Sequence, residues 1–178
     1  VVRPAYTLGG TGGGLVYNVE ELRVIVQRGL EASLTNQCLI EESVLGWEEL
    51  EVEVIRDAKN QMIAVCYIEN VDPMGVHTGD SFCVARLMTV DQSVKERLKD
   101  YAFRIVETIG VVGGTNVQLA HDPVSDRIVI IEINPRTSRS SALASKATGL
   151  PIALISTQLA SGMTLDEIPY WRDGTLEK

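Results

Sequence analysis

The stretch from residue 115 to residue 134 constrains the fold of this chain more than any other. Two apolar runs, Thr115–Ala120 and Arg127–Asn134, flank a turn-like sequence from Asp122 to Asp126. Runs rich in Val and Ile favour extended strands, whereas Asp, Pro and Ser favour tight turns. The pattern therefore predicts an antiparallel β-hairpin, and with it a chain that is built around a β-sheet.

Glu132 lies inside the second apolar strand, where a carboxylate is costly to bury unless a cation meets it. A hairpin centred near Ser125 places Gln118 opposite Glu132. The same register places Asn116 opposite Asn134, and because residues two apart share a face, all four side chains should point the same way. One carboxylate with several amide oxygens suits Mg²⁺ and, without His or Cys, suits Zn²⁺ poorly.

An ion pair is the alternative explanation for Glu132. The strand is followed by Arg136 and Arg139, and either guanidinium group could neutralise the carboxylate without a metal. The same arginines could instead bind the phosphate oxygens of a nucleotide that carries the metal. A register shift of one residue would also separate the ligands. The hairpin thus predicts a magnesium–nucleotide site at the end of a sheet and leaves the ion pair open.

The rest of the chain alternates between helical and strand patterns. Asn18, with Glu21 three residues later, is the expected N-cap of one helix, and Asp91 that of a long second helix. Two short helices close the chain, the last around Pro151–Ser161, and Thr164 begins one further turn. The other predicted strands are Cys38–Glu41, Trp47–Arg56, Met62–Ile68 and Ser81–Met88.

Two of these patterns predict burial. In the strand from 47 to 56, glutamates alternate with apolar residues, so we expect most of the glutamates to form a solvated sheet face. The long helix is expected to bury one apolar stripe, which consists of Val94, Leu98, Ala102, Ile105 and Ile109. His121, beside the turn of the hairpin, is expected at the surface.

The composition excludes some functions. The 178 residues carry a formal net charge of −8, which argues against nucleic-acid binding because such surfaces must offset phosphate charge. Neither a membrane-spanning run nor a signal peptide is visible, so we expect no membrane partner and a cytoplasmic location. Cys38, Cys66 and Cys83 are far apart and should be reduced and buried. The chain starts without Met and partway along a predicted strand, so we expect a piece of a longer polypeptide.

A glycine-rich loop spans Gly9 to Gly14. It lacks the lysine of a P-loop and the glycine spacing of a dinucleotide fingerprint. Its backbone N–H groups could still approach a phosphate, although a flexible turn explains the loop equally well. Arg3 just before the loop and His77 in the polar segment 70–80 could also bind phosphate. The alternatives are a surface arginine and a histidine with a backbone partner.

Five motifs in order carry a resemblance to a known family. They are Arg3 with the glycine-rich loop, Glu-Ser-x-x-Gly-Trp from 42, Glu-Asn-x-Asp-x-Met-Gly-x-His-Thr-Gly-Asp-Ser from 69, Asn-x-Gln from 116, and Glu-x-Asn-Pro-Arg-x-Ser-Arg-Ser-Ser from 132. Together they resemble the large chain of carbamoyl-phosphate synthetase, an ATP-grasp enzyme, from Arg3 to about Gly162. The sequence of residues 136–143 resembles that of the first synthetase half, which phosphorylates bicarbonate and yields carbamate after ammonia attacks.

The resemblance implies an α+β fold, in which an antiparallel sheet with flanking helices forms a single partial ATP-grasp domain that is incomplete at its N-terminal side. Residues 1–44 would carry the glycine-rich loop and a helix, and residues 45–178 the metal- and substrate-binding part. Because a preceding segment with another phosphate-contacting arginine is missing, the isolated chain is expected to be inactive or weakly active. In the parent enzyme, a glutamine amidotransferase small chain or domain would supply ammonia.

The resemblance also implies site residues, position by position. Those for ATP are Arg3, Gly9, Gly10 and His77 at the phosphates, Glu42 and Val44 at adenine, Glu49 at the ribose, Gly75 and Val76 in the cleft, and Gln118 and Glu132 at the metal-bound phosphates. The ligands of two Mg²⁺ or Mn²⁺ ions would be Gln118, Glu132 and Asn134, with Asn70 as a candidate ligand for K⁺. The catalytic residues would be Arg136 and Arg139, which would bind bicarbonate and carboxyphosphate.

Two other readings stay open. One is another ATP-grasp ligase, such as a relative of biotin carboxylase. The sequence of residues 136–141 disfavours this reading. The other is a fragment without catalysis that binds nucleotide weakly or serves only to assemble other domains. Binding of magnesium–ATP would separate the second of these from the enzymatic readings.

Overall fold

The computed structural model of this chain describes residues 1–76 and 81–169. The predicted phosphate contact at His77 lies outside the described residues. The chain forms two compact units, Val1–Val44 and Leu45–Lys178, and each unit has a sheet of its own. Among the described residues, no helix is both long enough and apolar enough to cross a membrane.

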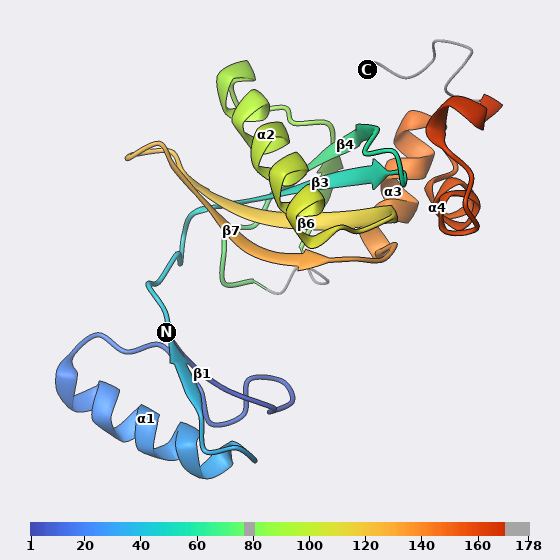
Figure 1. The fold of residues 1–178 in the computed structure, drawn as a ribbon. Coiled ribbons are helices and arrows are strands. Elements are labelled where there is room, and N and C mark those ends of the chain that lie inside the picture. The colour runs from blue at the N-terminus through green and yellow to red at the C-terminus, as the bar shows by residue number, and fades with distance from the viewer. Residues whose placement is uncertain (77–80, 170–178) are drawn as a thin grey trace. The chain divides into compact units, whose positions relative to one another are not determined.

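The first unit is a two-stranded antiparallel sheet with one helix. Strand β1 (Val2–Pro4) pairs with β2 (Cys38–Ile40), and helix α1 (Val19–Ala32) packs against β1 (Figure 1). Asn18 caps α1 as predicted, since its Oδ1 accepts from the Glu21 N–H at 2.8 Å. The Glu21 carboxylate in turn accepts from the Tyr17 N–H at 2.9 Å, which completes the start of the helix.

The second unit contains a five-stranded antiparallel sheet in the order β5-β4-β3-β6-β7. The strands are β3 (Glu48–Arg56), β4 (Met62–Asn70), β5 (Cys83–Ala85), β6 (Gly113–Asp122) and β7 (Arg127–Asn134). The helices are α2 (Gln92–Ile109), α3 (Arg139–Thr148) and α4 (Ile152–Ala160), followed by a 3₁₀ turn η1 (Leu165–Glu167).

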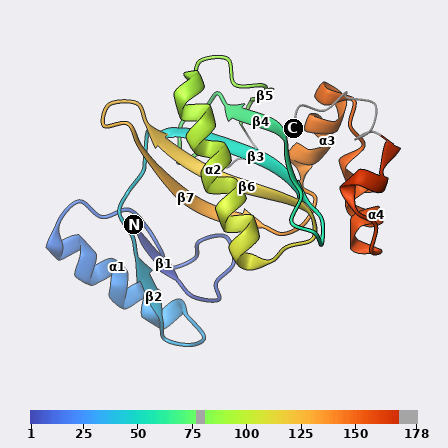
Figure 2. The same cartoon turned by 45° about the horizontal axis from the view of Figure 1, so that its top comes forward.

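Helices cover both faces of this sheet. Helix α2 lies across one face, as Figure 2 shows, and its buried side chains pack with Leu50, Val52 and Val54 of β3. Helices α3 and α4 and the η1 turn pack on the opposite face, with Ile55, Ile63 and Ile68. The strands between the helices are therefore buried on both sides, which is the reason why β3 is almost entirely buried.

The predicted solvated face of β3 is wrong. The side chains of Glu49, Glu51 and Glu53 are only 4%, 1% and 1% exposed. They lie on the face that α3 and α4 cover, and β3 is the central strand of the sheet. Alternation along a strand predicts that two faces differ, but it does not say whether a later helix covers the polar one.

The buried stripe of α2 also differs from the prediction. Val94, Leu98, Ala102 and Val106 are buried, whereas Ile105 is half-buried and Ile109 is 52% exposed. The buried residues form a single row with a spacing of four, which is one of the ridges that a helix presents to its neighbour. Asp91 is the N-cap residue by position, but its side chain makes no capping hydrogen bond.

Smaller differences concern β5 and the cysteines. The predicted strand Ser81–Met88 forms only at Cys83–Ala85, where it pairs with the end of β4. All three cysteines are free thiols; Cys66 is buried, and Cys38 and Cys83 are half-buried.

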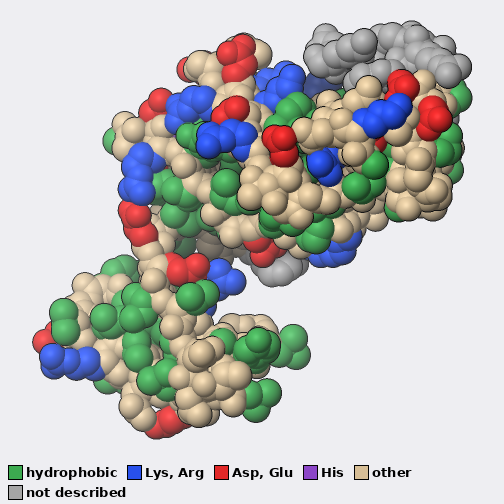
Figure 3. Space-filling model, in the orientation of Figure 1, with side chains coloured by type: hydrophobic (Ala, Val, Ile, Leu, Met, Phe, Trp, Pro, Cys, Tyr) green, Lys and Arg blue, Asp and Glu red, His purple; other side chains and the backbone are tan. Residues whose placement is uncertain are grey.

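On the face of the molecule in Figure 3, basic and acidic side chains are interspersed, so that face lacks the continuous basic surface that nucleic-acid binding requires.

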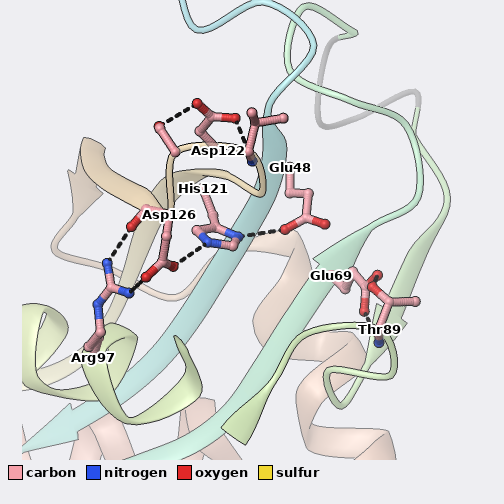
Figure 4. Close-up of polar contacts among 9 residues, drawn as sticks. Glu48, Glu69, Thr89, Arg97, His121, Asp122 and Asp126 are labelled. Carbon is pink, nitrogen blue, oxygen red and sulfur yellow. Dashed lines mark hydrogen bonds and ion pairs between the residues drawn. The ribbon is translucent and has the colours of Figure 1, made fainter. Parts of the chain in front are cut away.

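His121 is not at the surface, contrary to the prediction. It is 6% exposed, and its Nδ1 lies 2.7 Å from Glu48 Oε2 while its Nε2 lies 3.1 Å from Asp126 Oδ1 (Figure 4). Arg97 of α2 also binds Asp126, at 2.7 Å. These contacts tie the turn of the β6–β7 hairpin to the start of β3 and to α2.

Candidate functional site

A pocket of about 600 Å³ opens where the ends of β6 and β7 meet the start of α3. It lies within the second unit, and most of the residues that line it have polar side chains. The residues that line it are Glu51, Ser81, Cys83, Asn116, Gln118, Glu132, Asn134, Arg136, Ser138, Arg139, Ser140 and Leu143. The predicted metal ligands and both predicted catalytic arginines thus line one pocket.

The predicted register of the hairpin is confirmed. Gln118 pairs with Glu132, and Asn116 pairs with Asn134. Near the turn the register is shifted by one residue. His121 pairs there with Ile128, and the same register continued along the strands would not bring Gln118 opposite Glu132. A β-bulge between Gln118 and Leu119 restores the predicted pairing. Without the bulge, Gln118 would lie opposite Ile131, and the carboxylate would point to the other face.

Glu132 is not paired with an arginine. In the part of the chain that the structure describes, no ion pair joins Glu132 to Arg136 or Arg139. Instead, Asn134 lies between the charges: its Nδ2 donates to Glu132 Oε1 at 3.0 Å, and its Oδ1 accepts from Arg136 Nη2 at 3.2 Å. The ion-pair alternative therefore does not describe this arrangement, and the exposed Glu132 side chain lines the pocket.

The donor set fits a hard divalent cation that shares its coordination with a phosphate ligand. Gln118, Glu132 and Asn134 supply one carboxylate and two amide groups, and Mg²⁺ usually takes its remaining ligands from phosphates and water. Among residues 1–76 and 81–169, no group of three or more His, Cys, Asp or Glu side chains could hold a metal by itself. A cation between Glu132 and Asn134 would require the Asn134 amide to turn, because its oxygen faces Arg136 here.

Two buried carboxylates belong to the site although the sequence did not predict them there: Glu51 lines the pocket, and Glu53 lies next to it on the same face of β3. Asn116 Nδ2 donates to Glu51 Oε2 at 2.7 Å and to Glu53 Oε1 at 2.9 Å. Asn70 Nδ2 donates to Glu51 Oε1 at 3.0 Å, and the Cys83 thiol donates to Asn70 Oδ1 at 2.9 Å. The amide group of the buried Asn116 is thus used by these carboxylates, whereas Gln118 and Asn134 are half-buried.

Burial and negative charge both act on Cys83. Desolvation raises the pKa of the Cys83 thiol, and the nearby Glu51 and Glu49 carboxylates raise it further. The sulfur therefore stays protonated at neutral pH, which agrees with its role as a hydrogen-bond donor to Asn70. Ser138 and Ser140 of a serine-rich segment, Ser138–Ser141, also line the pocket, and the sequence pointed to this segment only as part of a family motif.

The other predicted ATP contacts are distributed between the two units. In the first unit, Arg3 Nη1 lies 3.3 Å from a carboxylate oxygen of Glu41. Gly9 and Gly10 have φ angles of +62° and +74°, a conformation that favours glycine. Glu42 and Val44 also belong to the first unit. The ATP-binding role of these residues remains a prediction.

In the second unit, Glu49 is buried on β3, and Val76 is exposed. Gly75 has a φ angle of +114°, and a Cβ atom there would lie 2.4 Å from a methyl group of Leu45. Neither Gly75 nor Val76 lines the pocket. The structure therefore brings together Gln118, Glu132, Asn134 and the two arginines, but not the other predicted nucleotide contacts.

Large chains of carbamoyl phosphate synthase are among the curated proteins with similar sequences. The large chain of carbamoyl phosphate synthase from Archaeoglobus fulgidus is 59% identical over 170 residues, which is 95% of this chain and 16% of that protein. The large chain from Thermomicrobium roseum is 57% identical over 169 residues, with the same coverage. This chain therefore spans about a sixth of the length of the curated relatives that it matches.

Solved structures share the fold at low sequence identity. A biotin carboxylase from Campylobacter jejuni aligns with a TM-score of 0.79 and 19% identity, over 96% of this chain and 38% of that chain. The biotin carboxylase domain of the 2-oxoglutarate carboxylase from Hydrogenobacter thermophilus aligns with a TM-score of 0.72 and 16% identity, over 92% and 36% of the two chains. The predicted fold, an antiparallel ATP-grasp sheet with flanking helices in a partial domain, is confirmed.

A family model agrees with these relatives. The model described as "Carbamoyl-phosphate synthase L chain, ATP binding domain" matches residues 1–168. The match covers both units and includes the hairpin, the arginines and the serine-rich segment. The chain therefore belongs to the family of ATP-binding domains of the carbamoyl-phosphate synthase large chain.

Proposed function

We propose that this chain phosphorylates bicarbonate with ATP, as part of the first synthetase half of a longer large chain. The product would be carboxyphosphate, which ammonia converts to carbamate on the way to carbamoyl phosphate. The observation that carries the proposal is the pocket in which Glu132 lies without an ion pair beside the exposed Arg136 and Arg139. Such an arrangement leaves both signs of charge for a magnesium–nucleotide and a small oxyanion.

The chemistry suits these side chains. An oxygen of bicarbonate attacks the γ-phosphorus of ATP, the bond from that phosphorus to the bridging oxygen breaks, and ADP leaves with the electron pair. Bicarbonate already carries a nucleophilic oxygen, so no catalytic base is needed. Arg136 and Arg139 would hold the planar anion in line through their forked N–H groups. The protein then contributes position and charge rather than covalent chemistry.

Gln118, Glu132 and Asn134 would hold magnesium, which when bound neutralises charge on the transferring phosphate. Mn²⁺ uses the same kind of oxygen ligands. A K⁺ site at Asn70 has less support, because the buried Asn70 side chain already bonds Glu51 and Cys83. The biotin carboxylase domain from Hydrogenobacter thermophilus was solved with MgADP, ADP and bicarbonate, which are ligands of the kind that the proposed reaction uses.

The competing readings predict different behaviour. A ligase of the biotin carboxylase type is disfavoured because those structures are under 20% identical, whereas the synthase large chains are 55–59% identical. Ammonia, and a glutamine amidotransferase chain or domain that delivers it, are part of the proposal for the longer protein. A fragment without catalysis would show no heat on titration with millimolar magnesium–ATP, and that result would reduce the proposal to common ancestry.

The decisive experiment is Glu132→Gln in the full-length protein. Because this change removes the only carboxylate of the proposed ligand set, we expect bicarbonate-dependent ATP hydrolysis to fall by about 100-fold or more. Glu96→Gln, an exposed carboxylate on α2, is the matched control and should keep the normal rate. A normal rate in Glu132→Gln, with both proteins folded, would contradict the metal assignment.

A further inference from the structure

The Glu53 carboxylate collects hydroxyl groups from one distant segment. Ser138 Oγ and Ser140 Oγ donate to Glu53 Oε1 at 3.0 and 2.8 Å. Ser141 Oγ donates to Glu53 Oε2 at 2.8 Å. Asn116 Nδ2 adds a fourth bond, to Oε1 at 2.9 Å. Three hydroxyls that lie 85 to 88 residues away in the sequence thus converge on one buried side chain.

These bonds account for a charge that would otherwise be costly to bury. A buried carboxylate is stable only when its oxygens find donors, and an ionised carboxylate has about four acceptor sites. Hydrogen bonds to a charged acceptor are also stronger than neutral ones. The three serines occupy the N-cap and first turn of the ten-residue helix α3, where the helix dipole favours a negative charge. Glu53 is therefore a strong anchor for the start of α3.

Helix capping alone does not explain the anchor. Ser138 and Ser141 form a reciprocal capping box, in which Ser138 Oγ accepts from the Ser141 N–H at 3.2 Å and Ser141 Oγ accepts from the Ser138 N–H at 2.8 Å. This box would start the helix without any carboxylate. Ser140 takes no part in the box, yet its hydroxyl also bonds Glu53. The contacts to Glu53 therefore fix where the segment lies against the sheet, in addition to starting the helix.

The anchored segment is the one that carries the two arginines. Arg139 lies between Ser138 and Ser140 in the sequence, and Arg136 lies two residues before Ser138. All four of these residues line the pocket, and both arginines are exposed. Long, exposed side chains hold a ligand in a defined orientation only when their backbone is held rigidly. The anchor supplies that rigidity from the central strand of the sheet.

We propose that Glu53 is a positioning residue, which acts through Ser138, Ser140 and Ser141 to hold Arg136 and Arg139 in the orientation that binds the oxyanion substrate. The proposal rests on the function proposed above for the two arginines. It assigns a functional role to a side chain that touches no proposed substrate or metal. It also explains the serines of the Arg-x-Ser-Arg-Ser-Ser segment by one shared acceptor.

The test uses Glu53→Gln and Ser140→Ala in the full-length protein. Glu53→Gln keeps the shape but removes the charge and one acceptor oxygen. Ser140→Ala removes one hydroxyl, which also lies 2.6 Å from Ser138 Oγ, and leaves both residues of the capping box in place. The control is Asp57→Asn, which alters another buried carboxylate, one that accepts hydrogen bonds from the backbone N–H groups of Lys59, Gln61 and Leu165. Bicarbonate-dependent ATP hydrolysis and hydrogen–deuterium exchange of the segment 134–145 are measured for each protein.

We expect Glu53→Gln to lower kcat about tenfold and to raise the KM for bicarbonate, while the KM for magnesium–ATP changes less than twofold. Ser140→Ala should show the same pattern more weakly. Amide exchange in residues 134–145 should be faster in both variants, but not in Asp57→Asn. If the KM values for bicarbonate and for magnesium–ATP instead rise equally in Glu53→Gln, and the kinetic changes match those of Asp57→Asn, the role of Glu53 is purely structural. That result would overturn the proposal.

The exchange measurement separates this proposal from the proposed function. If the wild-type protein lacks bicarbonate-dependent hydrolysis, the proposed function fails, and the role of Glu53 for this substrate fails with it. If the wild type is active and exchange in residues 134–145 is unchanged in Glu53→Gln, only the positioning role is overturned. Faster exchange together with the selective change in bicarbonate KM supports both.

Discussion

The two ends of the β6–β7 hairpin differ in whether their charged side chains form ion pairs. At the turn, His121 lies between Glu48 and Asp126, and Arg97 also binds Asp126 (Figure 4). Each of these four groups has a partner of opposite or potentially opposite charge. The contacts join three elements of the second unit, so this end of the hairpin has a structural role.

At the other end, opposite charges lie close together without forming a pair. Asn134 separates Glu132 from Arg136 and bonds to both of them, and the described residues contain no ion pair that involves Arg139. The proposed function uses the charges at this end to bind ligands, whereas the buried Glu53 carboxylate accepts four hydrogen bonds. The comparison teaches that pairing marks the structural end of one hairpin and its absence marks the candidate site.

The largest effect should come from the unpaired end. Arg136→Ala removes a forked donor for the proposed oxyanion, so we expect kcat for bicarbonate-dependent ATP hydrolysis to fall about 100-fold. The free energy of unfolding should change by no more than about 0.5 kcal/mol, because the side chain is exposed and its hydrogen bonds go only to the neighbouring Asn134 and Thr137. Enzyme kinetics and urea unfolding measure the two effects. A large loss of stability without a loss of rate would mean that this end of the hairpin is structural and is not the candidate site.

A smaller effect, with the opposite division between stability and rate, is expected at the turn. His121→Ala leaves the Glu48 and Asp126 carboxylates without their shared partner and creates a space in a buried position. We expect a loss of about 2 kcal/mol in the free energy of unfolding, with kcat nearly unchanged. Val124→Ala, at an exposed turn position, is the control and should change neither quantity. A rate that falls in His121→Ala while the protein stays folded would show that this end also serves catalysis.

The smallest effect concerns pH. The hydrogen bond from His121, and then the bond and charge of Arg97, lower the pKa of Asp126 below its usual value of 3.8. Because the folded-state pKa is the lower one, Asp126 contributes stability above about pH 3.8 and loses it as the pH falls through the folded value. The melting temperature of Asp126→Asn should therefore fall less steeply than that of the wild type between pH 4 and pH 2. Identical slopes would mean that Asp126 gains nothing from its partners.

The hairpin shows how far pattern reasoning reaches. Alternation and turn residues were enough to predict that Gln118 faces Glu132, and that pairing is confirmed. The bulge that produces it was not visible, because a bulge depends on backbone geometry rather than on residue type at this site. The prediction assumed a hairpin centred near Ser125. The pairing near the turn does not have that centre, but the unpaired residue of the bulge in β7 shifts the register so that Gln118 and Glu132 pair as predicted.

Burial was the harder property to predict. Glu51, Glu53 and His121 all belong to residue types that are usually exposed or intermediate, and all three are buried. Their partners come from segments that are distant in sequence, such as Ser138–Ser141 for Glu53 and Glu48 for His121. Local periodicity carries no information about such partners, so the polar face of β3 was assigned to solvent.

The sequence alone determined the order of strands and helices, the pairing of the hairpin and the oxygen-bearing side chains that gather at its end, because these depend on local pattern and on the alternation of a strand. Only the tertiary structure decided which carboxylates are buried and which face a pocket. That choice depends on where α3 packs, and its packing places three serine donors on Glu53 while leaving Glu132 open. The free energy of a charged side chain is set by the donors around it, and these donors meet only when the chain has folded.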